Sequence, residues 1–411
     1  MKTKITNFNK IIWFNLPITF LLLFFTTQAQ SKKIVQMSPK TGITIDNNDK
    51  YKLVFPKVFE GKRFSVGEAE AEQSRFSRLP NLIEQLNELG SQDYRLAFAL
   101  GGSPIAIVKS DESRYEYDWF QTTSPVFFVK SGFQEKQAEM AKQGFRVIEH
   151  FFVSQSCENR IPEQPALGEN CEYKDLFLFE KVKGVKKTVE QLLVNTFPGW
   201  GKKPSDELEK QIDDKLAEGF YPTNVFSKFE ILLERAKDKD DLLSDKPDVQ
   251  VVRSSGLRDN LEKKVNELAK QGYRLALTSN GIAVMYRNAE TAQIPVLYVW
   301  VKADKKSFEK DLAKLQAAGA VYRTTYPNEK GTANSLIFEQ KLKDDGKRAE
   351  FKILNIEFNV KENQVEKKVY VDLTPSSKEA VKAMNALAKE SFEVRDLFYT
   401  DKVSVILERI R

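Results

Sequence analysis

The chain has 411 residues, of which 64 are Lys or Arg, 58 are Asp or Glu and one is His. A net charge of +6 with 30% charged residues describes a solvated surface of mixed sign, which excludes the one-sided basic footprint of a nucleic-acid-binding protein. The single histidine excludes metal sites that need several, such as the His-Glu-x-x-His peptidase motif.

Residues 1–29 are typical of a signal peptide. Three lysines flank or precede an apolar segment at 11–25, and the small residues Thr27 and Ala29 then form a cleavage site. The alternative is an uncleaved membrane anchor, but the apolar segment is short for a membrane-spanning helix. Cleavage removes three lysines and lowers the net charge from +6 to +3. We expect a bacterial protein that is exported to the periplasm or secreted, with no transmembrane segment left after cleavage.

After this segment, an arrangement of strand, helix, strand and return strand occurs six times. The fourth copy shows it most clearly, with a one-sided apolar helix at 257–268, a helix-ending Gly272, an alternating strand at 273–278 and a return strand at 282–287. The six predicted helices lie at 81–89, 133–144, 206–219, 257–268, 308–319 and 379–390. One such unit cannot bury its own apolar face, so neighbouring units should complete one core.

The six copies form two matched blocks of three. Matched residues are Tyr94 with Tyr273, Phe133 with Phe308, and Gly144 with Gly319. The charged run at 237–248 between the blocks is typical of a linker. We therefore predict an α+β fold of two tandem domains, 47–236 and 249–411, each of three strand-helix-strand-strand units with mainly antiparallel sheet.

The copies share a short pattern, Leu-Asn-x-Leu followed by Gly, an aromatic residue and then Leu or Val on a strand. The residues that carry it are Leu86, Asn87, Leu89, Tyr94 and Leu96 in the first copy, and Val265, Asn266, Leu268, Gly272, Tyr273 and Leu275 in the fourth. In this pattern the chain resembles tandem copies of a small bacterial α+β domain of unknown function. The resemblance implies an α+β fold for each copy and implies no activity.

Cys157 and Cys171 are the only cysteines, and they flank a loop rich in Pro, Gly and Asn. In an exported chain, two cysteines at this spacing predict a local disulfide. A redox-active pair would need closer spacing, such as Cys-x-x-Cys. We predict a structural disulfide between these two residues.

No catalytic motif occurs in the sequence. His150 lies in a strand flanked by phenylalanines, which favours a packed residue over a catalytic base. The segment 199–205, Gly-Trp-Gly-Lys-Lys-Pro-Ser, lacks the upstream glycine of a phosphate-binding loop and the Ser or Thr after its lysine. We predict no catalytic residue, no metal-binding residue and no cofactor. A hydrolase that depends only on two carboxylates stays open as an alternative, because 58 acids offer many pairs.

Two aromatic features are candidate ligand or partner contacts. Tyr115, Tyr117 and Trp119 lie on one face of a predicted strand that has no clear counterpart in the second half. They predict a platform for sugar or peptide, and core packing is the alternative. Trp200 lies in a loop between two glycines, where binding residues are common, and packing on the adjacent helix is its alternative.

These features favour an exported, non-catalytic binding or structural protein of the cell envelope. Its partner would be an envelope protein or polysaccharide, and recognition would lie mainly in the first domain, which has the longer loops. The alternative is a carboxylate-dependent hydrolase acting on an envelope polymer. A cleft with two facing carboxylates would favour that enzyme, whereas acids scattered over helix faces would not.

Overall fold

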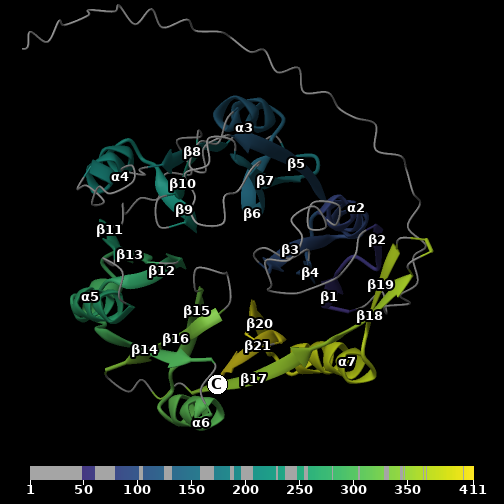
Figure 1. Cartoon of the computed structure of the whole chain (residues 1–411). Helices are drawn as coiled ribbons and strands as arrows, with labels where there is room; N and C mark the ends of the chain where they lie inside the picture. Colours follow the sequence, from purple (N-terminus) through teal and green to yellow (C-terminus); the bar gives the residue numbers. More distant parts are fainter. Residues whose placement is uncertain are drawn as a thin grey trace, which may run out of the picture. The chain divides into compact units, whose positions relative to one another are not determined.

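The computed structural model shows a series of small antiparallel sheets, with a helix beside all but one of them (Figure 1). It describes residues 49–60, 79–100, 105–124, 132–157, 171–185, 189–195, 207–227, 230–236, 248–253 and 258–411, with short gaps at 280, 304–305, 328–332, 343–345, 347, 364, 367 and 401. The predicted signal peptide and residues 237–247 of the predicted linker lie outside the described residues.

Six units follow one another along the chain, each with a first strand, a helix, a second strand and a third strand. The first strands are β1 (Tyr51–Val54), β5 (Tyr115–Ser124), β8 (Val189–Asn195), β11 (Asp248–Arg253), β14 (Val296–Lys302) and β17 (Ala349–Ile356). The helices are α2 (Leu79–Gly90), α3 (Phe133–Lys142), α4 (Glu207–Ala217), α5 (Arg258–Lys270), α6 (Phe308–Ala317) and α7 (Pro375–Lys389). The second strands are β3 (Tyr94–Ala99), β6 (Arg146–Cys157), β9 (Tyr221–Ser227), β12 (Arg274–Ser279), β15 (Val321–Pro327) and β20 (Glu393–Tyr399). The third strands are β4 (Ala106–Ser110), β7 (Cys171–Val182), β10 (Glu230–Ala236), β13 (Ile282–Arg287), β16 (Ala333–Lys341) and β21 (Val403–Ile410).

The predicted α+β class is wrong, because the described part of the chain is strand-rich, with 52% strand and 27% helix. The physical reason is the make-up of the unit, which contributes three strands for each helix. In every unit the third strand lies in the middle of its own three-stranded antiparallel sheet, between the first and second strands. The sheets therefore stay small and antiparallel, and helix does not balance strand.

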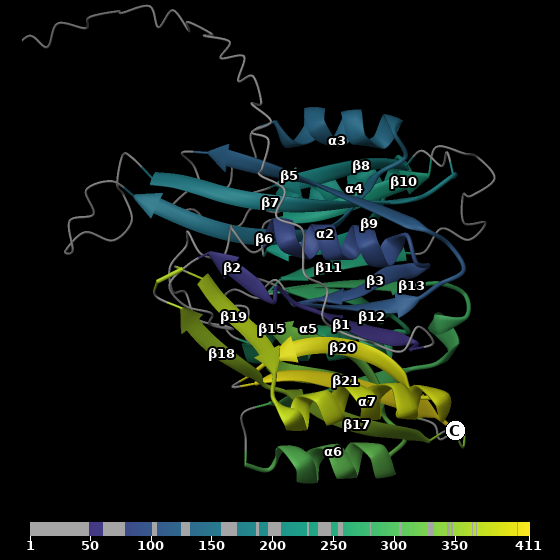
Figure 2. The same ribbon diagram turned by 90° about the vertical axis from the view of Figure 1, so that its right-hand side faces the viewer.

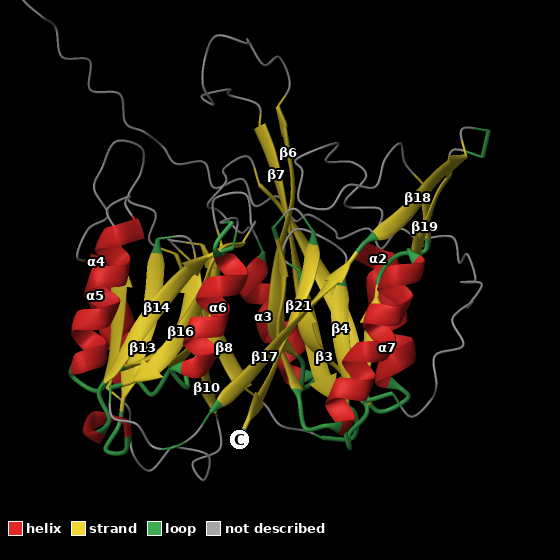
Figure 3. Ribbon diagram, turned by 90° about the horizontal axis from the view of Figure 1, so that it is seen from below, coloured by secondary structure: helices red, strands yellow, loops and turns green. Residues whose placement is uncertain are grey.

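A seventh sheet joins the first and last units. In unit 6 a hairpin of β18 (Phe358–Asn363) and β19 (Lys368–Leu373) stands between the first strand and the helix, and β19 pairs with β2 (Val58–Glu60) of unit 1. Figure 2 shows these three strands side by side, and Figure 3 shows the β18–β19 and β6–β7 hairpins extending beyond the other strands. This strand pairing ties the two ends of the described chain to each other.

Consecutive units share their apolar cores. Leu86 of unit 1 packs in one cluster with Leu178 of unit 2, and each later unit shares a cluster with the next one. The last cluster combines Phe392 of unit 6 with Tyr51 of unit 1, so the order of packing returns to its start. Ile45–Arg411 accordingly forms one compact unit. Two of the shared cores join the halves proposed as domains, and the independent folding of each half stays a prediction.

A β-bulge in each second strand directs one backbone position at the next unit. The residues before the first bulge of each strand are Leu96, Val147, Pro222, Leu275, Tyr322 and Val394. Five of these donate a backbone N–H across the interface over 2.6–3.3 Å, to Tyr117, Gln191, Tyr298, Glu408 and Tyr51 respectively. Pro222 has no N–H to donate, and the facing position in unit 4 is the apolar Val249. Each interface thus has an acceptor where the residue before the bulge has an N–H, and an apolar residue where it has none.

Candidate functional site: two grooves between units

An asparagine in three of the helices clamps the first strand of the next unit. The Asn87 side chain accepts the N–H of Tyr117 at 2.7 Å and donates to its C=O at 2.9 Å. Asn266 makes the same pair of bonds to Tyr298, and Asn385 makes them to Tyr51. An amide satisfies both backbone groups because it offers one acceptor and one donor side by side. The Asn of the Leu-Asn-x-Leu pattern is therefore an interface residue.

Two other helices have alanine at this position. Asn87 lies seven residues before Tyr94, where the second strand of its unit begins. Ala138 of α3 lies seven residues before Phe145, and Ala313 of α6 lies seven residues before Ala320, so both alanines occupy the asparagine position. An alanine cannot reach the strand edge with a polar atom. A groove lies at both places, between units 2 and 3 and between units 5 and 6, and we name these the first groove and the second groove.

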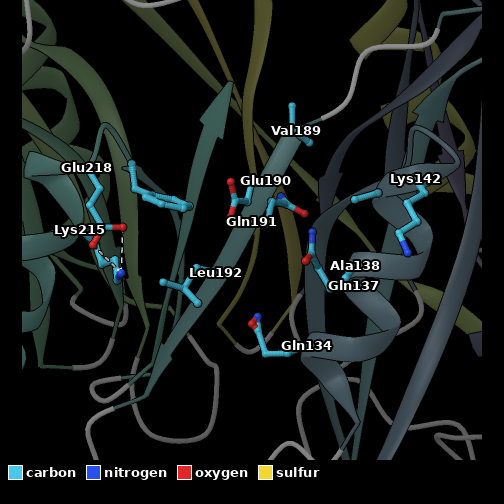
Figure 4. Close-up of a pocket in the computed structure, with 12 residues that line it drawn as sticks. Gln134, Gln137, Ala138, Lys142, Val189, Glu190, Gln191, Leu192, Lys215 and Glu218 are labelled. Carbon is cyan, nitrogen blue, oxygen red and sulfur yellow. Dashed lines mark hydrogen bonds and ion pairs between the residues drawn. The ribbon is translucent and has the colours of Figure 1, made fainter. Parts of the chain in front are cut away.

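The first groove has a volume of about 360 Å³. Figure 4 shows Gln134 and Gln137 extending from α3 toward β8 on the opposite side. The lining residues are Gln134, Gln137, Ala138, Ala141, Lys142, Val189, Glu190, Gln191, Leu192, Lys215, Glu218 and Phe220. Three glutamines, four charged residues and five apolar residues thus form its walls.

Gln137 is the polar group in the first groove whose bonding is incomplete. Its side chain is only 4% exposed, and its Nε2 meets no acceptor among the described residues. Burying an amide donor without a partner costs about 1–3 kcal/mol. The side-chain amide of Gln191, across the groove, has all its partners by contrast. It accepts the N–H of Val147, and it donates to the C=O of Val147 and to Glu234.

The second groove has a volume of about 480 Å³ and a different balance of polar groups. Leu312 and Gln316 of α6 stand where α3 has Gln137 and Ala141. Gln316 accepts the N–H of Phe351 at 3.2 Å, so the helix satisfies this strand edge in part. The second groove therefore does not repeat the unsatisfied donor of the first.

The acids that line the first groove are held in ion pairs. Glu190 binds Arg235 at 2.6 Å, and Glu218 binds Lys215 at 2.7 Å. A hydrolase of the two-carboxylate type needs one acid free to give a proton and another free to attack or to activate water. In the described lining of this groove, both carboxylates already have a cation.

Two further carboxyls lie just after bulges, on β6 and β20. Glu149 and Asp396 each accept the N–H of the next residue, at 3.0 and 2.7 Å. Burial raises the pKa of both, and it raises that of Glu149 to about 7. Asp396 also accepts hydroxyls of Tyr322 and Thr325 from unit 5, whereas the matching positions in unit 1 are Leu96 and Ala99. Glu149 thus lies at the position of Asp396 but faces apolar residues where Asp396 faces two hydroxyl groups.

The predicted aromatic platform lies largely in the core. Tyr115 and Tyr117 are 6% and 3% exposed, and Trp119 is half-buried against the same cluster. The Tyr117 hydroxyl donates to Glu180 at 3.2 Å, which explains its place inside the interface. The prediction that this strand has no counterpart is wrong, because β14 pairs with β16 as β5 pairs with β7. Tyr298 and Trp300 take the places of Tyr117 and Trp119.

The other predicted residues are only partly described. Trp200 lies outside the described residues. The backbone register places Cys157 of β6 opposite Cys171 of β7. Opposed residues of antiparallel strands have Cα atoms about 4.5–5.5 Å apart, which lies in the range that a disulfide needs. The disulfide itself stays a prediction.

His150 is partly buried on β6 with aromatic neighbours. Its Nε2 lies 2.7 Å from Asp175, and its ring packs 4.8 Å from Phe177 and 4.9 Å from Phe226 of unit 3.

Nothing in the sequence marked Gln137, Ala138 or the first groove, since their importance depends on which strand faces α3. Sequence comparison of the clamp positions with one another would have shown the Asn-to-Ala exchange.

Comparisons with protein-family models, with curated proteins and with solved structures return no match to the chain. Within the described residues, no cluster of three or more His, Cys, Asp or Glu side chains is arranged to hold a metal ion. In the same part of the chain, no helix combines the length and apolar character that crossing a membrane requires.

Proposed function

We propose that the protein is an exported, non-catalytic binding protein of the cell envelope, and that it holds its partner in the first groove. The observation that carries this proposal is the buried Gln137 amide in the wall of the groove, whose Nε2 meets no acceptor among the described residues. A concave site with a few converging polar groups is the usual form of a ligand pocket. The partner is an envelope protein or polysaccharide.

Export is supported by the sequence of residues 1–29 and by the opposed cysteines of β6 and β7. The location is the periplasm or the exterior of a bacterial cell. The mature protein purified from that compartment should have an intact mass two hydrogens below that of the fully reduced chain. Two cysteines that label in the native state would contradict the disulfide.

Binding is tested by affinity capture from an envelope extract with the mature chain. The decisive variant is Gln137→Leu, which removes the amide and gives the first groove the residue type of Leu312 in the second. The matched control is Leu312→Met, which alters only the second groove. We expect a captured partner with the parent chain and the control, and its loss with Gln137→Leu in a variant whose melting is unchanged. Equal capture by all three would contradict the proposal.

A further inference from the structure

We propose that two copies of this chain pair through β18 of unit 6, strand against strand and antiparallel, about a two-fold axis. This surface belongs to unit 6, whereas the first groove lies between units 2 and 3, so the pairing goes beyond the proposed function. A two-fold axis makes both copies use the same patch, which must then be complementary to itself.

The strand β18 lies at an open edge. In the described part of the chain it has a strand neighbour on one side only, which is β19. Its residues 359–362 are all exposed, and β19 is the one described element with which it makes extensive contact. Figure 3 shows the β18–β19 hairpin extending beyond the other strands. An open strand edge of this kind is a template for pairing with another chain.

Alternate residues of β18 direct their backbone groups toward this edge. The N–H of Thr374 bonds the C=O of Glu357 at 3.2 Å, and this pair continues the register between β18 and β19. In an antiparallel ladder, every second residue bonds the same neighbour. Counted from Glu357, the intervening residues Phe358, Val360 and Glu362 therefore direct their N–H and C=O away from β19. The edge offers a row of three residues to a further strand.

The apolar face of the sheet reaches the same edge. Val371 and Leu373 of β19 are buried in the core that units 6 and 1 share, and Phe358 packs against it. Val360 lies opposite Val371 on this face but is 39% exposed, whereas Val371 is 4% exposed. A further strand would cover Val360 if it placed an apolar residue opposite, as cross-strand pairs require.

The strand β18 itself has the sequence that this edge requires. With the two-fold axis at Val360, this residue lies opposite Val360 of the second copy, on the apolar face. Phe358 then lies opposite Glu362 of the second copy, and Glu362 opposite Phe358. All three residues that direct their backbone groups to the edge therefore pair with one another, within the bounds of β18.

The charges of β18 favour this register over its neighbours. On the polar face, Lys361 lies opposite Asn359 of the second copy and diagonally from its Glu357, so opposite charges come near each other. A lysine on an edge strand often prevents pairing, and an axis at Lys361 would indeed place the two lysines directly opposite. An axis at Asn359 would instead leave Glu362 without a partner residue in β18.

The test is sedimentation velocity of the full mature chain at micromolar to submillimolar concentrations, where we expect a monomer–dimer equilibrium. Val360→Pro removes the outward N–H and keeps the bonds of the hairpin, because proline is tolerated where the N–H of an edge strand faces solvent. It should raise the dissociation constant of the dimer at least about tenfold, since two symmetric hydrogen bonds are lost. Val360→Ile is the matched control and should dimerise as the parent does.

The register has a separate test in disulfide cross-linking. Val360→Cys should give a covalent dimer on mild oxidation, because residues opposed in antiparallel strands lie within the range of a disulfide. Asn359→Cys should not, since it lies opposite Lys361 on the other face. A chain that stays monomeric, or equal cross-linking by the two variants, would overturn the proposal. A monomer that captures another envelope protein through Val360 would also overturn it and assign the edge to that protein.

Discussion

The first and second grooves occupy matching places in the two halves of the chain, yet their polar groups are arranged in opposite ways. In the second groove, Gln316 of the helix satisfies the strand edge at Phe351, and Leu312 faces the groove with an apolar side chain. In the first groove, the helix contributes Gln137 and Ala141 at these positions, so it offers no side-chain amide to the strand edge, and the Gln137 Nε2 is buried with no acceptor among the described residues.

The difference separates a groove whose strand edge is bonded by the helix from a groove whose helix offers that edge no amide. The place of one glutamine, at Gln137 in α3 and one turn later at Gln316 in α6, decides whether the helix bonds the strand edge.

The largest effect is expected from separating the halves, 47–236 and 249–411. The sequence predicts that each folds alone, but separation exposes the core shared by units 3 and 4 and the core shared by units 6 and 1. We expect each half to melt cooperatively but about 10 °C or more below the whole chain, since the lost burial amounts to several kcal/mol. Thermal melting of the two halves and of their mixture measures this. A half without a cooperative transition would contradict the two-domain division.

Glu149 should make stability depend on pH in the first half. Its folded-state pKa of about 7 lies above the usual value of 4.5, so the folded protein holds this proton more tightly than the unfolded chain does. Its contribution is complete below about pH 4.5 and is lost as the pH rises through 7, which amounts to about 3 kcal/mol. Glu149→Gln should remove that loss.

The measurement is urea unfolding of the parent and of Glu149→Gln at intervals between pH 4.5 and 8. The matched control is Thr324→Val, at the equivalent position of unit 5, which should leave the pH dependence as it is. Parallel curves for the parent and Glu149→Gln would show that Glu149 is not the group responsible.

Removing a clamp should cost more than changing a groove. Asn266→Ala leaves the backbone N–H and C=O of Tyr298 unbonded in a part-buried place, which should lower the free energy of unfolding by about 2–3 kcal/mol. Asn87→Ala should cost the same, because the two clamps are equivalent. Chemical denaturation of both variants checks this, and a difference of more than about 1 kcal/mol between them would break the equivalence of the halves.

The interface between units 3 and 4 is predicted to tolerate no extra donor. Pro222→Ala creates a backbone N–H that faces Val249, and leaving it unbonded should cost about 1–2 kcal/mol. Adding Val249→Tyr in the same chain should recover part of that loss, as Tyr117 does for Leu96. Unfolding free energies of the two variants measure the recovery. If the single change is neutral, the N–H has found another acceptor.

The smallest effect is a gain. Ala138→Asn should raise the free energy of unfolding by about 1 kcal/mol, because it satisfies the edge of Gln191 as Asn87 satisfies that of Tyr117. Ala313→Asn should give less, since Gln316 already bonds Phe351. Equal gains from the two changes would remove the distinction between the grooves.

Much of the local structure was predictable from the sequence. The apolar faces of the helices, the turn before each second strand and the match of Tyr94 with Tyr273 all follow from periodicity and residue type. Gly272 illustrates this, since its φ of +91° and a close approach of Ala292 both favour glycine. The six-unit pattern does not predict the β18–β19 hairpin, although Val369, Val371 and Leu373 alternate in the way that a one-sided strand requires.

The tertiary structure decided which of these elements face one another. Asn87 and Ala138 occupy the same place in their helices, and only the strand packed against each helix makes one a clamp and the other the wall of a groove. The same holds for Tyr117, whose side chain is suited to a binding platform by type but is buried by the unit beside it. The periodicity of apolar residues is a property of each segment, because it depends only on residues that are close together in the sequence. Pairing across an interface depends on contacts between residues far apart in the chain, which no local pattern records.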